Sequence, residues 1–266
     1  MIRDITLGQY YPAASVLHRL DPRVKLSGTL IYVISLFLFQ SFTGYIVATV
    51  FLVSMIALSR VPVGFIFRGL KAIFAFLVIT AVLNVFLTPG RELVSFWKFT
   101  ITIEGVRLAA FMMIRLVYLI IGSSIMTLTT TPSSLTDGLE KGLGWMKVMK
   151  VPVHEIAMMM SIALSFIPIL MEETDKIIKA QQARGADFES GNLIRRIRSL
   201  VPILVPLFVS AFRRANDLAL AMESRCYRGG EGRTKLHPLK YKKRDAAAYL
   251  VLLLYLAAIV AVGIIF

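Results

Sequence analysis

Two arginines, each inside a short triplet, are the side chains best suited to binding a partner. Ala183-Arg184-Gly185 and Ser224-Arg225-Cys226 each end a long, largely apolar segment, and their arginines lie 41 residues apart. A guanidinium presents a rigid fork of N–H donors that fits carboxylates and backbone carbonyls. A single basic residue at a helix end needs no function, because it complements the helix dipole. The repetition of the triplet, once per segment, favours a docking role for both.

Motifs for catalysis or nucleotide binding do not accompany these arginines. The sequence has no G-x-x-x-x-G-K-[ST] phosphate loop and no G-x-S-x-G nucleophile elbow. His154-Glu155 begins like a zinc-protease helix but lacks the second histidine, and the chain has three histidines in all. We therefore expect a chain that is not an enzyme and that binds no metal or cofactor itself. Any ATP-driven work must come from other subunits.

The composition predicts an all-α polytopic membrane protein. Hydrophobic residues make up 57% of the chain and the mean hydropathy is +0.72, above the roughly 45–50% apolar share of soluble domains. The apolar residues gather in runs long enough to cross a bilayer. We expect five principal transmembrane helices, at 24–42, 45–58, 70–87, 106–128 and 246–266.

Basic residues between these runs set the expected orientation. They flank the first run and fill the second loop, whereas the loop 89–105 has balanced charges and carries Trp97. The positive-inside rule then places the N-terminus in the cytoplasm and the Trp97 loop outside. The net charge of +14 is explained by topology and by contact with lipid and partners, and no basic-aromatic module indicates nucleic acid.

The segment 129–244 differs from the rest, so we divide the chain into a membrane domain (1–128), a cytoplasmic or interfacial coupling domain (129–244) and a final transmembrane helix (245–266). The coupling domain contains two long predicted helices, 153–184 and 193–225, apolar first and charged later. Length, prolines and basic ends favour helices that lie along the bilayer against a partner, although further spans stay open. The first helix carries a Met-rich apolar stretch, which is either core filler or a compliant docking surface. Its members are Met158, Met159, Met160, Phe166, Ile167 and Leu170.

Arg115 lies inside the fourth run. An arginine within a transmembrane segment is by default a functional-site hypothesis. The alternative is that it snorkels or pairs inside the helix bundle.

Taken together, these features resemble the EcfT family, the transmembrane T components of energy-coupling factor (ECF) vitamin transporters. The resemblance covers essentially the whole chain and rests on four stretches: Leu17-His18-Arg19-Leu20-Asp21-Pro22-Arg23-Val24-Lys25, Met126-Thr127-Leu128-Thr129-Thr130-Thr131-Pro132, Gln181-Gln182-Ala183-Arg184-Gly185 and Ser224-Arg225-Cys226-Tyr227-Arg228-Gly229.

The resemblance implies a function and a set of partners in a bacterial cytoplasmic membrane. Two crossed coupling helices would each dock an Ala-Arg-Gly-like triplet onto one of two ABC-type ATPase subunits, which hold ATP and Mg²⁺. Ala183-Arg184-Gly185 matches fully, whereas Ser224 and Cys226 depart from the pattern and Arg225 keeps it. The chain would join those ATPases to a substrate-binding S component, for which the Met-rich stretch is the candidate surface. The transported vitamin or metal would be selected by the S component.

Two other functions compete with this one. A permease of an ordinary ABC importer would also dock an ATPase, but the paired triplets argue against it. A self-contained secondary transporter would use Arg115 in a midplane site, yet the sequence lacks the repeated halves typical of such proteins.

Overall fold

The computed structural model describes residues 10–39, 41–96, 99–186, 188, 193–230 and 238–265. The chain forms two compact units, which are treated separately below. One comprises Gly8–Lys141 with Leu239–Phe266, and the other comprises Gly142–Pro238. Trp97, on which part of the expected orientation rests, lies outside the described residues.

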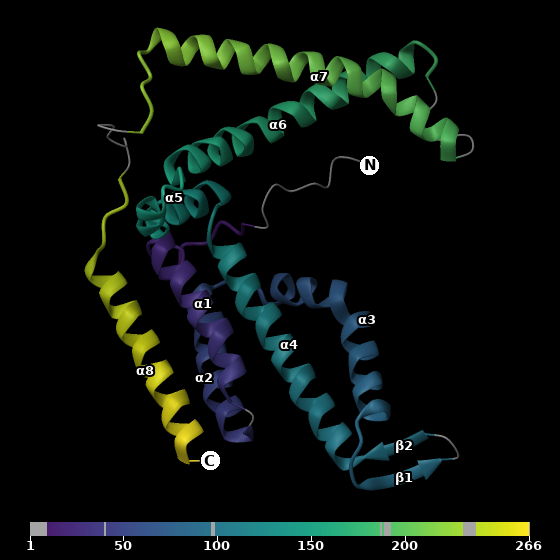
Figure 1. The fold of residues 1–266 in the computed structure, drawn as a ribbon, viewed down its shortest axis with the longest axis vertical. Helices are drawn as coiled ribbons and strands as arrows, with labels where there is room; N and C mark the ends of the chain where they lie inside the picture. The colour runs from purple at the N-terminus through teal and green to yellow at the C-terminus, as the bar shows by residue number, and fades with distance from the viewer. Residues whose placement is uncertain are drawn as a thin grey trace. The chain divides into compact units, whose positions relative to one another are not determined.

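The first unit is a helical bundle with a small hairpin (Figure 1). Three of its helices begin at side-chain caps: the Asp21 side chain accepts the Arg23 N–H, and Ser41 and Thr102 do the same for Gly44 and Gly105. In chain order the elements are α1 (Pro22–Leu38), α2 (Phe42–Ser59), α3 (Val63–Leu87), β1 (Glu92–Phe96), β2 (Phe99–Thr102), α4 (Ile103–Thr129), α5 (Pro132–Gly142) and α8 (Lys243–Ile265).

The hairpin is an addition to the expected architecture. β1 and β2 pair antiparallel, with Phe96 opposite Phe99 and an irregularity between Glu92 and Val94. The sequence analysis treats this stretch as a loop. Two strands of four or five residues in a short connection carry too little periodicity to be recognised.

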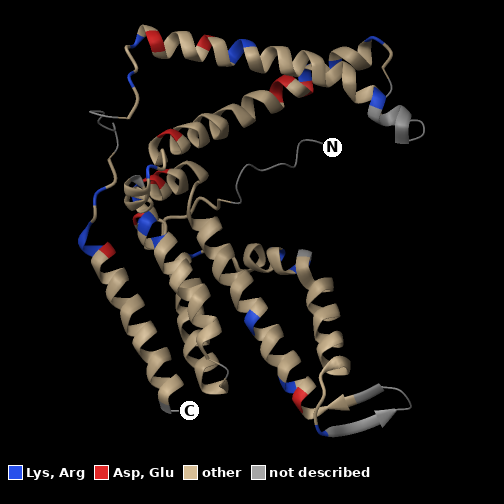
Figure 2. Ribbon diagram, viewed as in Figure 1, with Lys and Arg blue, Asp and Glu red and all other residues tan. Residues whose placement is uncertain are grey.

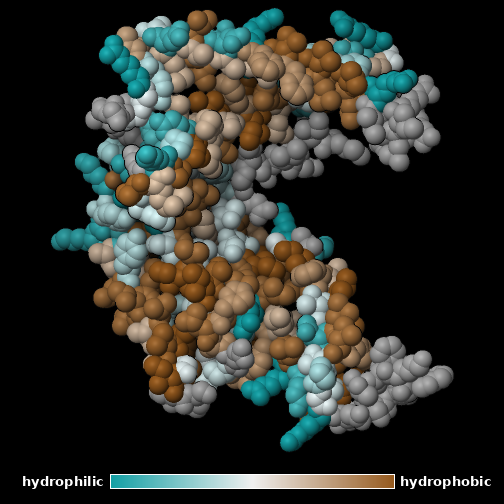
Figure 3. Space-filling view, in the orientation of Figure 1, coloured by the Kyte–Doolittle hydropathy of each residue, from teal (hydrophilic) through white to brown (hydrophobic). Residues whose placement is uncertain are grey.

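Aromatic rings from three helices form the centre of this bundle. The rings of Phe51 and Tyr255 stack with centroids 4.1 Å apart, and Tyr32 stacks on Phe51 at 5.8 Å. Around them the helices leave large apolar side chains exposed on the outside, and Figure 3 shows this hydrophobic surface in brown. Figure 2 shows that α1, α2 and α8 carry almost no charge between their ends. Apolar exteriors with charged ends are typical of helices that contact lipid.

Within the described residues, four helices are long and apolar enough to cross a membrane: α2, α4, α6 (Val153–Ala183) and α8. A fifth span results if α3, which bends by 58° between Val63–Lys71 and Ile73–Leu87, is counted as one. The chain is therefore a multi-pass, predominantly helical membrane protein, as expected. The helices that qualify differ from the predicted spans in two ways. The 17-residue α1 was predicted to span but does not qualify, and α6 qualifies although it was not among the five.

The second unit contains a short 3₁₀ helix, η1 (Gly144–Met149), and two long helices, α6 and α7 (Leu193–Ser224). The structure confirms the two predicted helices to within one residue at each end. Both helices continue through their prolines, Pro168 in α6 and Pro202 and Pro206 in α7.

Candidate functional site

The first triplet forms a Schellman-type end to α6. The Gly185 N–H donates to the Gln182 carbonyl and the Ala186 N–H donates to the Gln181 carbonyl, each at 2.9 Å. This pair of bonds requires a left-handed residue after the helix, and Gly185 supplies it with φ +86°. Arg184 is therefore held at the last turn by a defined backbone geometry.

The second triplet ends α7 in the same way. The Cys226 N–H donates to the Glu223 carbonyl at 2.9 Å and the Tyr227 N–H donates to the Met222 carbonyl at 3.0 Å. Each of these atoms lies 41 residues after its counterpart in α6. Cys226 takes the place of Gly185 and adopts φ +55°. In sequence Cys226 departs from the pattern, but the backbone turn it makes is the same.

All six residues of the two triplets are exposed. Figure 1 shows α6 and α7 crossing, with their carboxyl ends on different sides of the crossing. The unit thus presents two separate arginine-bearing ends rather than one combined site.

An ion pair lies where the two helices pack together. The Arg214 Nη2 donates to the Glu173 Oε2 at 3.4 Å. Glu173 precedes Arg184 by 11 residues, and Arg214 precedes Arg225 by the same interval. That interval is about three helical turns, or roughly 16 Å. The pair therefore joins equivalent positions of two matched helices.

The charges at these equivalent positions are opposite. Glu172-Glu173 in α6 corresponds, at the 41-residue offset, to Arg213-Arg214 in α7. The sequence analysis did not single out these residues. The sequence pattern that could have revealed them is an acidic pair and a basic pair at the same distance before the two triplets. This pattern indicates an ion pair only once the two helices are known to cross.

The Met-rich stretch of α6 is only partly accessible. Met159, Met160 and Ile167 are exposed, whereas Met158, Phe166 and Leu170 are half-buried. At about 100° per residue, five of the six share a sector of roughly 120°, and Met158 falls about 100° from Met159 on the other side. The helix therefore presents five of these residues as one surface and separates Met158 from it.

A second apolar stripe lies on α7 and was not among the residues expected from the sequence. Its members share one side of the helix and leave roughly half or more of each side chain exposed: Val201, Leu204, Val205, Phe208 and Phe212. The spacing i, i+3, i+4, i+7, i+11 is the signal that could have found it.

Arg115 is tied to a helix end. Its Nη2 donates to the Phe39 carbonyl at 3.3 Å, and its guanidinium carbon lies 5.2 Å from the centroid of the Phe37 ring. Phe39 follows the last residue of α1, whose final turn contains no basic residue. Arg115 therefore supplies positive charge where the helix dipole favours it. These contacts favour pairing inside the bundle over a substrate site.

The first two sequence stretches of the family resemblance meet in the bundle. The Lys25 Nζ, at the start of α1, donates to the Thr129 carbonyl, at the end of α4, at 2.8 Å. The Tyr11 N–H donates to the Leu128 carbonyl at 2.9 Å. The two stretches therefore hold one helix start against one helix end.

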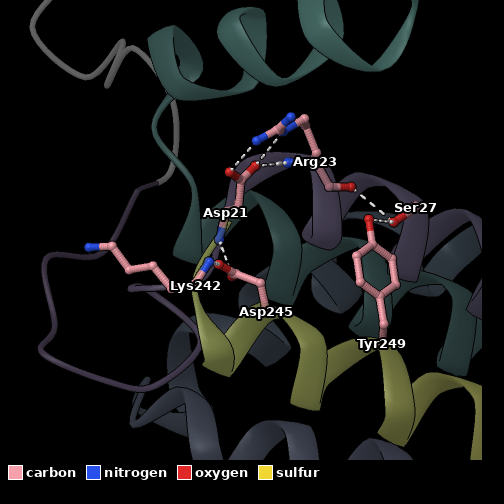
Figure 4. Close-up of polar contacts among 6 residues, drawn as sticks. All are labelled: Asp21, Arg23, Ser27, Lys242, Asp245 and Tyr249. Carbon is pink, nitrogen blue, oxygen red and sulfur yellow. Dashed lines mark hydrogen bonds and ion pairs between the residues drawn. The ribbon is translucent and has the colours of Figure 1, made fainter. Parts of the chain in front are cut away.

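Asp245 fastens α8 to the same junction (Figure 4). One carboxylate oxygen accepts the Lys242 N–H at 2.8 Å, which caps α8, and the other accepts the Asp21 N–H at 2.9 Å. Asp245 is 2% exposed, so both bonds are shielded from water. Arg23 completes the junction with an ion pair to Asp21 at 2.9 Å.

Burial of Asp21 works against its ionised form, yet the hydrogen bonds from the side chain and backbone of Arg23 outweigh burial. The pKa of Asp21 therefore lies below its ordinary value of 3.8. A depressed pKa stabilises the folded state above the unfolded pKa, and this stability is lost as the pH falls through the folded value. The junction is thus fully formed at neutral pH.

Comparison with known proteins agrees with these features. The family model described as CbiQ, cobalt transport protein, matches residues 13–236. The chain is 58% identical over 252 residues to the energy-coupling factor transporter transmembrane protein EcfT of Clostridium kluyveri, covering 94% of this chain and 93% of the relative. It is 53% identical to the protein so named in Thermosediminibacter oceani (94% of each chain) and 45% identical to that of Bacillus subtilis (97% and 98%). The chain therefore belongs to the EcfT proteins of the CbiQ family, the non-catalytic transmembrane components of energy-coupling factor transporters.

Proposed function

We propose that this chain is the scaffold that couples ATP hydrolysis by two ATPase subunits to micronutrient uptake through a substrate-binding S component. The observation that carries the proposal is the identical backbone end of α6 and α7 at the two arginine triplets. One docking end for each of two similar subunits requires this kind of repetition.

In this proposal the exposed guanidinium groups of Arg184 and Arg225 bind carboxylates or backbone carbonyls on the ATPases. ATP and Mg²⁺ are held by those subunits. Closure of the ATPases moves the two helix ends, and the crossing of α6 with α7 passes the movement on. Residues 129–244 act as the coupling domain between the membrane segments 1–128 and 245–266, with the N-terminus in the cytoplasm.

The docking role is tested with Arg184→Glu and Arg225→Glu combined. The double variant should lose most of its co-purifying ATPase, because each acidic side chain repels the partner group that the guanidinium bound. Co-purification from membranes that express the complete transporter measures this directly.

The matched control is Lys179→Glu with Arg228→Glu. Both of these residues are exposed, lie close to the triplets and give the same change in charge. The control should retain both ATPases. Equal loss in the two double variants would show a general charge effect and would contradict docking through the triplets.

We also propose that the exposed apolar surface of α6, extended by the stripe on α7, binds the S component. Unbranched Met side chains can repack against different partners. Met159→Asp and Ile167→Asp should each weaken binding of the S component by tenfold or more, because a carboxylate buried in an apolar contact is costly. The ATPases should stay attached.

Ser165→Asp serves as the control for these variants. Ser165 is exposed on α6 at about 120° or more from both residues. Affinity capture with a tagged S component gives the comparison. Full retention of the S component by Met159→Asp and Ile167→Asp would contradict this surface.

A further inference from the structure

A cavity of about 280 Å³ lies within the unit formed by Gly8–Lys141 and Leu239–Phe266. Helices α1, α2, α4 and α8 contribute its walls. The lining is almost entirely apolar along its length, with side chains such as Val24, Leu52, Ile125, Val251 and Leu252. No role proposed above uses this space.

Positive charge is confined to one end of the cavity. Among its lining residues Lys25 and Arg244 are the two cations. Lys25 lies in the first turn of α1 and Arg244 in the first turn of α8, while Thr129, which also lines the cavity, ends α4. The Lys25 hydrogen bond to Thr129 and the Asp21 hydrogen bond to Asp245 show that these helix ends are neighbours. The two cations therefore lie together at one end of the cavity, which we take as its mouth.

One N–H group of the Arg244 side chain has no acceptor within the described part of the chain. Its Nε is buried and has no hydrogen-bond partner there. A buried N–H without an acceptor is costly. An acceptor group placed at the mouth would remove that cost.

Aromatic rings lie away from the cations, toward the other end of the cavity. Tyr32 and Phe51 line it there and stack on each other, and Phe51 also stacks on Tyr255. From Lys25 to Tyr32, or from Arg244 to Leu252, the depth is seven or eight residues of helix, about 11 Å. The space is thus a narrow apolar slot with a cationic mouth.

We propose that this slot binds one acyl chain of an anionic phospholipid, whose phosphate lies between Lys25 and Arg244. The apolar walls favour a hydrocarbon chain over water, and the two cations favour a negative headgroup over a zwitterionic one. A free phosphate ion could bind to Lys25 and Arg244 but would leave the apolar slot empty. The mouth lies at the end of the bundle that the basic loops assign to the cytoplasm, where anionic lipids of the inner leaflet are available.

Native mass spectrometry of the full chain with added phosphatidylglycerol, and with phosphatidylcholine of the same acyl chains, tests this proposal. The wild type should retain phosphatidylglycerol in preference. Arg244→Gln should weaken that binding about fivefold, since one cation near a headgroup contributes on the order of this factor. Ala248→Leu, which fills the slot from α8, should remove binding.

Two neighbouring residues provide matched controls. Lys243→Gln removes the same charge from an exposed position that does not line the cavity, and Ala246→Leu adds the same side chain on an exposed position. Both should bind phosphatidylglycerol like the wild type. Thermal unfolding of each variant separates lost binding from lost folding.

Three results would overturn the proposal. Equal weakening by Lys243→Gln and Arg244→Gln would reduce the effect to general surface charge. Unchanged binding by a folded Ala248→Leu would place the lipid elsewhere, or indicate that the mouth binds only a free anion. Loss of a partner subunit by Ala248→Leu, with phosphatidylglycerol still bound, would assign the slot to a protein segment.

Discussion

Cys226 differs in residue type from Gly185 but forms the same backbone turn at the end of its helix. It stands where Gly185 stands in the other triplet, with a positive φ that L-residues adopt at a cost of about 1–2 kcal/mol. The Schellman bonds of both helix ends are nonetheless complete. The strain is local to the turn that positions Arg225.

We expect Cys226→Gly to stabilise the end of α7 and Gly185→Ala to destabilise the end of α6, each by about 1 kcal/mol. A Cβ at Gly185 would meet no atom within 4 Å, so only the backbone conformation changes its energy. Amide hydrogen exchange in the last turn of α7 should slow about fivefold in Cys226→Gly. Exchange in the last turn of α6 should become about fivefold faster in Gly185→Ala.

Cys226→Ala is the control for this pair, because it keeps the Cβ and therefore the strain. Its exchange rates should match the wild type. A rate change as large as that of Cys226→Gly would mean that the thiol, and not the backbone, sets the local stability.

The residue scale also shows what sequence reasoning could reach. Arg184 and Arg225 were identified because a short arginine triplet recurs at the ends of two long apolar segments. The equivalence of Cys226 could not be predicted, since a positive φ at cysteine follows from the completed turn and not from its own preference. The pairing of Arg115 with Phe39 equally required the position of α1 beside α4.

At the scale of elements, local patterns predicted the two long helices, whereas their crossing was expected only from the family resemblance. Apolar first halves, charged second halves and the triplets that end the two segments placed both helices to within a residue. The Glu173–Arg214 ion pair depends on how the helices pack, which no local pattern encodes. The hairpin β1–β2 was missed for a different reason, because its strands are short.

The Glu173 and Arg214 side chains are partly exposed. Because an ion pair in contact with solvent contributes little to stability, about 0.2–1 kcal/mol, we expect this pair to fix the crossing point rather than the fold. Glu173→Arg should lower the uptake obtained per ATP hydrolysed several-fold, with the ATPases still bound. Exchanging the charges, with Glu173→Arg and Arg214→Glu together, should restore most of it. Proteoliposomes that contain the complete transporter give both rates.

Glu172→Arg is the matched control, since it makes the same change one residue away at an exposed position. It should leave the coupling ratio near that of the wild type. If the exchanged pair stayed as impaired as Glu173→Arg alone, the attraction between these two side chains would not be the cause.

At the scale of the whole molecule, the chain offers a direct test of its proposed orientation. Cys226 is its single cysteine and is exposed. A membrane-impermeant maleimide should label it in inside-out vesicles and not in intact cells. Bound ATPases should slow the labelling, because their docking covers the triplet.

The complementary variant carries Cys226→Ser with Arg91→Cys, which moves the thiol to the exposed loop before β1. It should be labelled from outside the cell. Labelling of Cys226 in intact cells would reverse the proposed topology.

Hydropathy predicted five spans, and the described residues contain four helices that are long and apolar enough, or five if the bent α3 is counted, with a different membership. Apolar runs alone do not separate α6, which is long and apolar enough to span, from a helix that lies against a partner. The proposed function makes this distinction depend on the subunits that would cover the apolar surface of α6.

The equal intervals from Glu173 to Arg184 and from Arg214 to Arg225 have a mechanical consequence. If the C-terminal parts of α6 and α7 rotate about the Glu173–Arg214 ion pair, the two arginine-bearing ends move through equal distances for a given rotation. In the proposed function such a scaffold would give its two ATPases equal leverage, so identical or different ATPases would drive it alike. If each end has a preferred subunit, the preference must come from the residues that flank the arginines, Ala183 and Gly185 on one side and Ser224 and Cys226 on the other.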